Sequence, residues 1–394
     1  MIELFKEKKS CCGCAACANA CPRQVITMQP DEDGFIYPVV NGDLCVECGL
    51  CQKVCAFQNI PVTADEPLAT YAATNKNQEI LLNSASGGLF GALASLVFEK
   101  NGVVFGCAWN FNMEPEHICI DNLADTKKLQ GSKYVQSSIK NTYTEALKYL
   151  KSGKHVLFTG TPCQIAGLKS YLGKDYENLI TSDLICHGVP NSEFFKGYIN
   201  YLEGKLKGKV IDFKFRDKSK GWSLLAKATY IREDKTYSKM IPISSSYYYT
   251  YFLYGDIYRE NCYECKYAGG NRQGDFTMGD YWGVQQAHPE IKTKNGVSVL
   301  LANSEKGVAL IEKMKKYLDL TPSTFEQARS SNGQLGQPTS MSSKRDEILR
   351  LWREEGSQAV ADKYKITPKE MIANMIRALL PYSVKETMKK VFIK

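Results

Sequence analysis

The sequence predicts a protein that mixes α-helices and β-strands and is divided into three successive parts. Clustered cysteines in residues 1–60 predict a small metal-binding domain. Strand-like and helix-like segments alternate over residues 65–340, an order typical of a core with parallel strand–helix–strand units. Residues 341–394 have the apolar spacing of helices, which predicts a helical C-terminal tail.

The composition is that of an ordinary globular protein. Hydrophobic residues make up 44% of the chain and charged residues 23%. The longest apolar stretch, Leu89 to Phe98, is too short to span a bilayer. Residues 1–10 lack the charged-then-apolar layout of a signal peptide. We therefore expect a cytoplasmic protein.

Two runs of four cysteines share the spacing C-x2-C-x2-C-x3-C. Pro22 follows the first run, whereas Ala56 takes the corresponding place after the second. Three cysteines of such a loop bind one 4Fe-4S cube, and the fourth reaches the other cube. Zinc sites instead use separated cysteine pairs, which makes zinc improbable here. The spacing predicts a bacterial-ferredoxin-like domain whose first cluster is held by Cys11, Cys14, Cys17 and Cys55, and whose second is held by Cys45, Cys48, Cys51 and Cys21.

Two further cysteines follow a predicted strand–helix–strand unit. The strands cover His155 to Thr159 and Leu179 to Cys186, and their spacing is that of a right-handed parallel crossover. Cys163 and Cys186 then lie just past the carboxyl ends of neighbouring strands, where ligands of open α/β sheets gather. If Cys262 and Cys265 fold back to this edge, four thiolates meet at a third cluster. The alternative is two buried thiols and an unrelated C-x2-C that binds zinc, and the spacing leaves both open.

Small residues precede a predicted helix that begins at Leu89. The segment Asn83 to Gly88 leaves free backbone N–H groups at the positive end of this helix, which suits a phosphate group or the edge of a flavin. Serine is also a common helix cap, so this signal alone is weak. The sequence contains neither G-x-G-x-x-G nor a Walker A loop.

The remaining charged and thiol groups have simpler interpretations. We interpret Cys12, Cys107 and Cys119 as packing residues. The formal net charge is +8, and a solvated surface is the favoured interpretation of the basic residues between 205 and 220; attraction of an acidic partner or anionic substrate is the alternative. No nucleic-acid-binding motif accompanies them, so no nucleic-acid partner is expected. These basic residues are Lys205, Lys207, Lys209, Lys214, Arg216, Lys218 and Lys220.

The C-terminal tail is predicted to form four helices. Their ranges are Lys344 to Glu355, Gln358 to Tyr364, Pro368 to Leu380 and Val384 to Ile393. The last two are basic and amphipathic, so they could rest on an anionic membrane or dock on a partner. We favour the simpler interpretation that the tail caps the adjacent domain.

Six short motifs occur one after another along the chain. They are Ser84-Ala85-Ser86-Gly87-Gly88, Gly131-Ser132-Lys133-Tyr134-Val135, Thr159-Gly160-Thr161-Pro162-Cys163-Gln164, Cys186-His187-Gly188, Cys262-Tyr263-Glu264-Cys265 and Gly279-Asp280-Tyr281-Trp282-Gly283. In this order they resemble the beta subunit of coenzyme F-420 hydrogenase and dehydrogenase. The resemblance covers roughly residues 1–340, and the combination is specific although no single motif is.

This resemblance implies an α+β flavoprotein that binds FAD beside a 4Fe-4S cluster. It implies that Cys163, Cys186, Cys262 and Cys265 hold the third of three clusters. His187 could relay protons to the flavin, although a lone histidine is more often structural. The residues that the resemblance places around the flavin are Ser86, Gly87, Gly88, Lys133, Tyr134 and Thr161.

The function expected from these features is that of an iron–sulfur flavoprotein oxidoreductase. Electrons would pass between the clusters and FAD, with ferredoxin, a deazaflavin or a nicotinamide carrier as redox partner and a small organic molecule as substrate. Family members include bacterial proteins associated with polysaccharide synthesis. The rival hypothesis is a non-catalytic electron-transfer subunit that connects a partner enzyme to ferredoxin. Such a subunit needs no flavin motifs.

Overall fold

The computed structural model describes residues 2–60 and 63–364 and has an eight-stranded central sheet. Its strand order is β13-β3-β12-β11-β7-β6-β4-β5. The four central neighbours β11, β7, β6 and β4 are parallel, and the outer strands add antiparallel pairs on both sides. The strands are β3 (Ala69–Asn75), β4 (Val103–Trp109), β5 (Pro115–Ile120), β6 (Val156–Thr159), β7 (Leu179–Leu184), β11 (Phe276–Asp280), β12 (Ser298–Ala302) and β13 (Leu318–Ser323).

The predicted parallel crossover is confirmed. Strand β6 pairs in parallel with β7, and helix α7 (Pro162–Leu172) connects them. The sequence Thr161-Pro162-Cys163-Gln164 explains where α7 begins. The Thr161 and Gln164 side chains form a reciprocal capping box, and Pro162 occupies the first turn, where no N–H is required. This turn fixes Cys163 at the carboxyl edge of the sheet.

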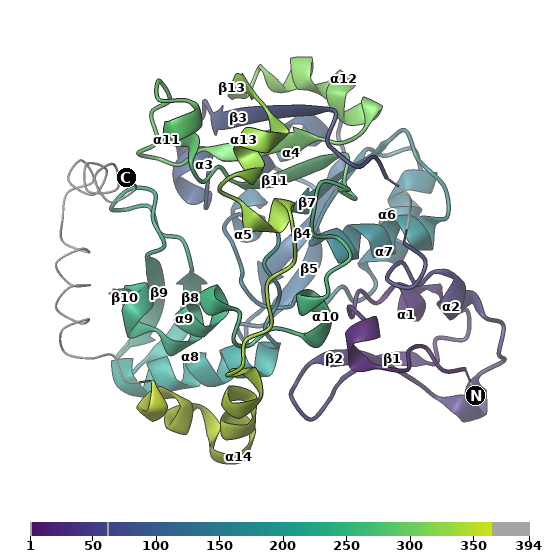
Figure 1. Cartoon of the computed structure of the whole chain (residues 1–394), viewed down its shortest axis with the longest axis vertical. Coiled ribbons are helices and arrows are strands. Elements are labelled where there is room, and N and C mark those ends of the chain that lie inside the picture. The colour runs from purple at the N-terminus through teal and green to yellow at the C-terminus, as the bar shows by residue number, and fades with distance from the viewer. Residues whose placement is uncertain (1, 61–62, 365–394) are drawn as a thin grey trace.

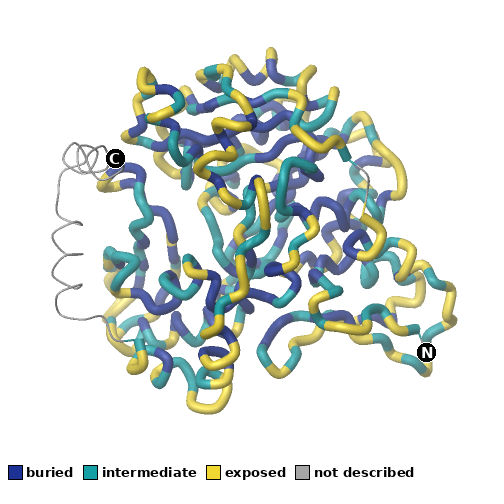
Figure 2. Tube along the Cα trace, viewed as in Figure 1, coloured by how far each residue is buried: buried dark blue, intermediate teal, exposed yellow. Residues whose placement is uncertain are grey.

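Helices cover both faces of the central sheet because its strands alternate apolar side chains between them. Val104 and Leu157 pack with α4 (Leu89–Phe98) on one face. Phe105 and Phe158, the next residues along each strand, pack with helices on the other face. Figure 2 shows the resulting buried centre. The other covering helices are α3 (Gln78–Asn83), α5 (Thr126–Leu129), α6 (Thr142–Lys151), α12 (Glu305–Met314) and α13 (Phe325–Arg329).

A second, three-stranded sheet is inserted between β7 and β11, which was not predicted from the sequence. Its order is β10-β9-β8, and it lies beside the helices α8 and α9 (Figure 1). These elements share an aromatic core that contains Phe195, Tyr198 and Tyr248. The C-terminal helix α14 packs on α8 through Ile348 and Leu349. The inserted sheet and the helices that pack with it are α8 (Ser192–Leu206), β8 (Lys209–Lys214), β9 (Ala226–Arg232), β10 (Lys235–Ile241), α9 (Tyr247–Tyr254) and α14 (Arg345–Lys363).

The cysteine-rich N-terminal domain lies beside the central sheet, at the lower right of Figure 1. It consists of α1 (Ala16–Ala20), α2 (Leu50–Lys53) and a hairpin of β1 (Ile26–Pro30) and β2 (Ile36–Val40). Helix α1 packs on α7 of the central domain. Its cysteines are therefore close to the carboxyl edge that carries Cys163.

The remaining observations concern two predicted tail helices, the question of membrane-spanning helices, and two short helices inside the chain. The two helices expected at Pro368 to Leu380 and Val384 to Ile393 lie outside the described residues. Among the described residues, no helix is long and apolar enough to cross a membrane. The short helices α10 (Glu260–Tyr263) and α11 (Val284–Ala287) complete the α-helices of the described part of the chain.

Candidate functional site

The first cysteine set comes together around the start of α1. The thiol of Cys17 interacts electrostatically with those of Cys14, Cys11 and Cys55. The backbone bends sharply here, with Gly13 and Ala15 at φ of +67° and +61°. These bends allow closely spaced cysteines to face a common point, as cluster loops require. Burial raises the pKa of the Cys11 thiol to about 11. The free energy of metal binding must therefore drive its deprotonation.

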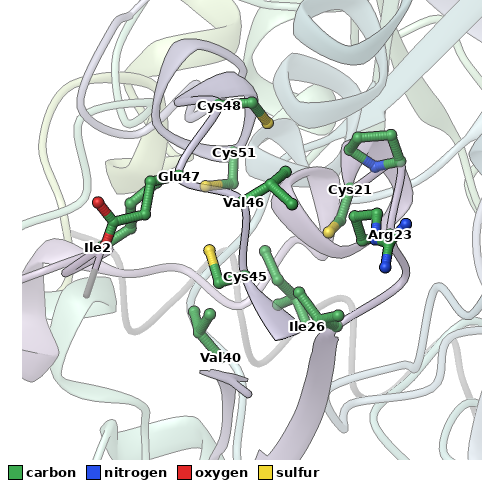
Figure 3. A pocket seen from close by; sticks show the side chains of 12 residues that line it. Ile2, Cys21, Arg23, Ile26, Val40, Cys45, Val46, Glu47, Cys48 and Cys51 are labelled. Atoms are coloured by element: carbon green, nitrogen blue, oxygen red, sulfur yellow. The ribbon is translucent and has the colours of Figure 1, made fainter. Parts of the chain in front are cut away.

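The second cysteine set surrounds a small pocket at the surface of the N-terminal domain. Figure 3 shows Cys45, Cys48 and Cys51 around this pocket together with Cys21, which comes from the first run. Apolar side chains such as Val40 complete the wall. Both sets therefore have the exchanged membership that the spacing predicts. That each set binds a 4Fe-4S cluster stays a prediction.

The third cysteine set also converges. Cys262, in α10, interacts with Cys186, Cys265 and Cys163. Cys186 follows β7 and interacts in turn with Cys163 and Cys265. Burial raises the pKa of Cys186 to about 12. Four thiols from three separate segments thus face one another, which is the arrangement required by the third-cluster hypothesis.

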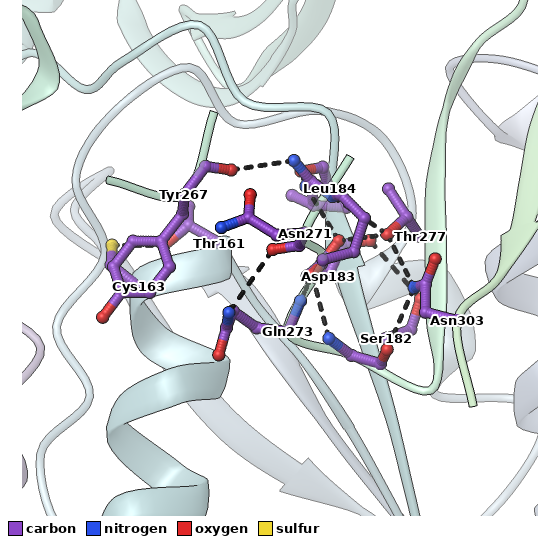
Figure 4. Close-up of polar contacts among 12 residues, drawn as sticks. Thr161, Cys163, Ser182, Asp183, Leu184, Tyr267, Asn271, Gln273, Thr277 and Asn303 are labelled. Carbon is purple, nitrogen blue, oxygen red and sulfur yellow. Dashed lines mark hydrogen bonds and ion pairs between the residues drawn. The ribbon is translucent and has the colours of Figure 1, made fainter. Parts of the chain in front are cut away.

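A buried ion pair holds the segment after Cys265 against β7. Arg272 Nη2 lies 2.9 Å from Asp183 Oδ1, and both side chains are essentially inaccessible to solvent. The other oxygen of Asp183 accepts from the backbone N–H groups of Gln273 and Gly274, at 2.8 and 2.9 Å. Arg272 also donates to the carbonyl oxygen of Tyr267. Figure 4 shows Asp183 between Gln273 and Thr277. These bonds explain why a segment far along the chain returns to Cys163 and Cys186.

None of these sets has the compact geometry of a single-ion site. In the described part of the chain, no group of three or more His, Cys, Asp or Glu side chains could hold one metal ion as the side chains stand. A 4Fe-4S cube binds each thiolate to a different iron, so its four sulfurs stand farther apart than those around one ion.

A cleft opens beside the third cysteine set, with a volume of about 270 Å³. Its wall combines polar loops with apolar and aromatic side chains, including Tyr134, Phe252 and Trp282. Cys186 lines this cleft and also belongs to the third cysteine set. The cleft and the cysteine set therefore share a wall, at the carboxyl edge where α/β proteins bind ligands.

Five of the six predicted flavin residues line this cleft. They are Ser86, Gly88, Lys133, Tyr134 and Thr161. Gly87 instead packs against the central sheet, which corrects its expected position. A Cβ atom on Gly87 would stand 2.1 Å from the carbonyl oxygen of Ala73 and 2.5 Å from the nitrogen of Ser298. The close contact between these backbones is a sufficient reason for a glycine at this position.

The start of α4 offers polar backbone groups to the cleft. Gly88 is the residue before the helix, with φ of +81°, and no side chain caps the first turn. Lys133 lies nearby and donates to the carbonyl oxygen of Gln130 at 3.1 Å, while burial lowers its pKa. A helix N-terminus and a cation together are suited to an anionic group.

Two residues of the predicted basic surface are buried, which corrects that interpretation for them. Arg216 forms an ion pair with Asp280, a cleft residue, with Nη2 and Oδ1 3.3 Å apart. Lys218 donates to the carbonyl oxygens of Leu81 and Ser86 and thereby holds the loop before α4. Burial lowers the pKa of Lys218 to about 7. Lys205, Lys207, Lys209, Lys214 and Lys220 are not buried, in agreement with a solvated surface.

Two histidines face the cleft from different walls. His187 lies beside Cys186, and desolvation lowers its pKa while Asp280 opposes the shift. His117 is buried in the wall of the cleft; its Nε2 lies 3.0 Å from the carbonyl oxygen of Thr159, and the hydroxyl of Ser137 lies 3.1 Å from Nδ1. Burial lowers the pKa of His117 to about 4. No sequence pattern singled out His117, because its partners come from other segments.

Comparison with known proteins relates the N-terminal domain and the central domain to redox proteins. Residues 10–59 match a 4Fe-4S dicluster domain. Residues 153–326 match the family described as the C terminus of the beta subunit of coenzyme F420 hydrogenase/dehydrogenase. The chain is 23% identical over 164 residues to a subunit of the F(420)H(2) dehydrogenase of Methanosarcina mazei. That match covers 39% of this chain and 46% of the relative, so the chain spans about half the length of this relative.

A solved structure was also matched. It is from the F420-reducing [NiFe] hydrogenase complex of Methanosarcina barkeri, with a TM-score of 0.45 and 15% sequence identity. The superposition covers 77% of this chain and 94% of that chain.

The two matched domains define the class: a protein in which a 4Fe-4S dicluster domain precedes a domain found in redox subunits. Residues 153–326 carry the C-terminal domain of the coenzyme F420 hydrogenase/dehydrogenase beta subunit. The resemblance seen in the sequence motifs is thereby confirmed.

Proposed function

We propose that this chain is an iron–sulfur flavoprotein oxidoreductase with three 4Fe-4S clusters and FAD. The observation that carries the proposal is the shared wall between the third cysteine set and the cleft, formed by Cys186. FAD exchanges single electrons with clusters and a hydride with organic molecules. A cofactor in this cleft would therefore stand next to the innermost cluster.

The residues of the cleft fit the two ends of FAD. The uncapped start of α4 and the ammonium of Lys133 suit a pyrophosphate. Aromatic side chains suit the ring system, among them Tyr134 and Trp282, the latter stacked on Trp222 with ring centroids 4.9 Å apart. His187 would hold or move a proton at the mouth of the cleft.

The three cysteine sets form a continuous route to the cleft. Cys48 of the second set is exposed, so electrons would enter or leave there. Cys14 of the first set interacts with Cys163 of the third. The proposed carriers are ferredoxin, a deazaflavin or a nicotinamide, and the substrate is a small organic molecule, with polysaccharide synthesis as the suggested setting. The proposed compartment is the cytoplasm, because its reducing conditions favour clustered cysteines as metal ligands over disulfides.

The second candidate is a non-catalytic subunit that passes electrons to a partner enzyme. The Methanosarcina mazei relative is named as a dehydrogenase subunit, which favours this candidate. Both candidates use the clusters, but only the first needs a flavin in the cleft.

Flavin extraction from anaerobically purified protein separates the two candidates. We expect about one FAD per chain in the wild type. Ser132 lines the cleft, so Ser132→Trp should fill it and remove FAD, whereas the control Ser132→Ala should retain FAD. Iron content should stay equal in both variants. A wild type that neither contains nor takes up flavin would support the electron-transfer subunit instead.

A further inference from the structure

A single arginine lies between the first and third cysteine sets. Arg259, just before α10, is 0% exposed. Its Nε donates to the carbonyl oxygen of Cys11 at 2.9 Å, and its Nη1 donates to that of Ile36 at 2.8 Å. The guanidinium also lies over the ring of Tyr37, with 3.7 Å between Cζ and the ring centroid. The side chain therefore reaches from the third set into the N-terminal domain.

The backbone of Arg259 is tied to the third set. Its N–H donates to the carbonyl oxygen of Val189, three residues beyond Cys186, at 2.9 Å. Its own carbonyl accepts from the N–H of Cys262 at 3.0 Å. Thus one residue contacts the main chain of a cysteine from each set.

The charge of Arg259 is not neutralised by any carboxylate among residues 2–60 and 63–364. No ion pair involves its guanidinium in that part of the chain, and its Nη2 has no hydrogen-bond partner although it is buried. A buried charge without a counter-charge is strongly unfavourable. Such an orphaned donor indicates that an anion belongs beside it.

The groups that feel the charge of Arg259 and become anionic on metal binding include thiols of the two cysteine sets. The positive charge of Arg259 opposes the rise in the pKa of Cys11 and favours the thiolate of Cys163. The two sets are adjacent, because the buried thiol of Cys12 contacts both Cys14 and Cys163. Four thiolates and the sulfides of a 4Fe-4S cube give it a net negative charge, which grows on reduction.

We propose that Arg259 is the shared counter-charge of the first and third clusters and raises the reduction potential of both. The proposal rests on the proposed function, because it requires a cluster at the third cysteine set. A fixed cation stabilises the reduced cube more than the oxidised one. One electron leaves one cluster and arrives at the other, and no bond is made or broken at Arg259. It is a positioning residue that acts through the clusters.

The test is a redox titration of anaerobic protein, followed by electron paramagnetic resonance, on Arg259→Gln and Arg259→Lys. Arg259→Gln should lower the midpoint potentials of the first and third clusters and leave that of the second unchanged. Arg259→Lys should restore most of the shift. Arg353→Gln is the control, because it removes the same charge from a more exposed ion pair with Asp33 and should leave all three potentials unchanged. Unchanged potentials in Arg259→Gln at full iron content would overturn the proposal.

A second measurement on the wild type covers the case in which Arg259→Gln does not fold. Protein labelled with ¹⁵N-arginine should show a ¹⁵N hyperfine coupling to the reduced first cluster, and the lack of that coupling would overturn the proposal. Iron content separates this outcome from a failure of the proposed function. Iron for only two cubes in the wild type would refute the third cluster itself.

Discussion

Arg216 and Asp280 form an ion pair across the base of the cleft, 64 positions apart in the sequence. The side chain of Arg216 is 2% exposed and that of Asp280 is 13% exposed. Asp280 also accepts from the indole N–H of Trp222 at 3.0 Å, and Arg216 lies against the ring of Trp282. The pair therefore joins the inserted sheet to the aromatic wall of the cleft.

Removing one partner of this pair should lower the free energy of unfolding more than removing a surface charge does. Arg216→Met leaves Asp280 without its counter-charge, so we expect the free energy of unfolding to fall by about 3–5 kcal/mol and FAD affinity to fall with it. Chemical denaturation followed by circular dichroism measures the first effect. Lys220→Met, at an exposed position two residues beyond Lys218, is the control and should change little. Equal stability of both variants would contradict the role given to the pair.

The exchanged cysteine gives a prediction that is specific to one cluster. Cys21 belongs to the first run in sequence but lines the pocket formed by Cys45, Cys48 and Cys51. Cys21→Ala should therefore damage the second cluster and leave the first largely intact. Electron paramagnetic resonance of the reduced protein distinguishes the two signals. Loss of the first cluster instead would mean that each run binds its own fourth thiolate.

His117 should make stability depend on pH in the acidic range. Its pKa is about 4 in the fold, against an ordinary value of 6.5, so only the unfolded chain binds the proton between these limits. Stability should therefore fall as the pH falls from 6.5 toward 4, by up to about 3 kcal/mol from this group. The variant His117→Gln lacks this contribution. The difference in the free energy of unfolding between the wild type and the variant should therefore shrink as the pH falls. Denaturation midpoints of both proteins at several pH values test this, and a constant difference would refute it.

Gly87 should be intolerant of a methyl group even when no flavin is bound. The methyl group would clash with the main chain of β3 and β12. Gly87→Ala should therefore lower the free energy of unfolding by about 1–3 kcal/mol. Gly131 has a positive φ and lies at the cleft, but a Cβ there meets open space. A second control is Gly333→Ala, because Gly333, like Gly87, has no positive φ and its Cβ would meet open space; Gly131→Ala shows the effect of positive-φ strain alone. Thermal unfolding of the flavin-free proteins compares them, and equal midpoints would contradict the packing role.

Local sequence rules predicted the parts of the fold that short segments determine. The crossover through α7 follows from the capping residues Thr161 and Gln164, and the membership of the first two cysteine sets follows from spacing. The inserted sheet was not predicted, in part because Lys209 and Lys214 of β8 were interpreted as members of a solvated basic surface.

Contacts between distant residues could not be predicted in this way. Arg216 and Lys218 resembled members of a solvated basic run, because Asp280 and the carbonyl oxygens of Leu81 and Ser86 that hold them lie far along the chain. Arg259 and Cys11 are 248 positions apart. Gly87 belongs to a motif whose neighbours line the cleft, and only the folded backbone shows that it faces the sheet.

The iron content of anaerobically purified protein tests the central claim most directly. Three cubes require about twelve irons per chain, four for each cube. Cys186→Ala should remove the iron of the third cluster alone and lower the content to about eight, because the first two sets do not use this thiol. A wild-type content of about eight irons, unchanged in Cys186→Ala, would show that Cys163, Cys186, Cys262 and Cys265 hold no cluster beside the cleft.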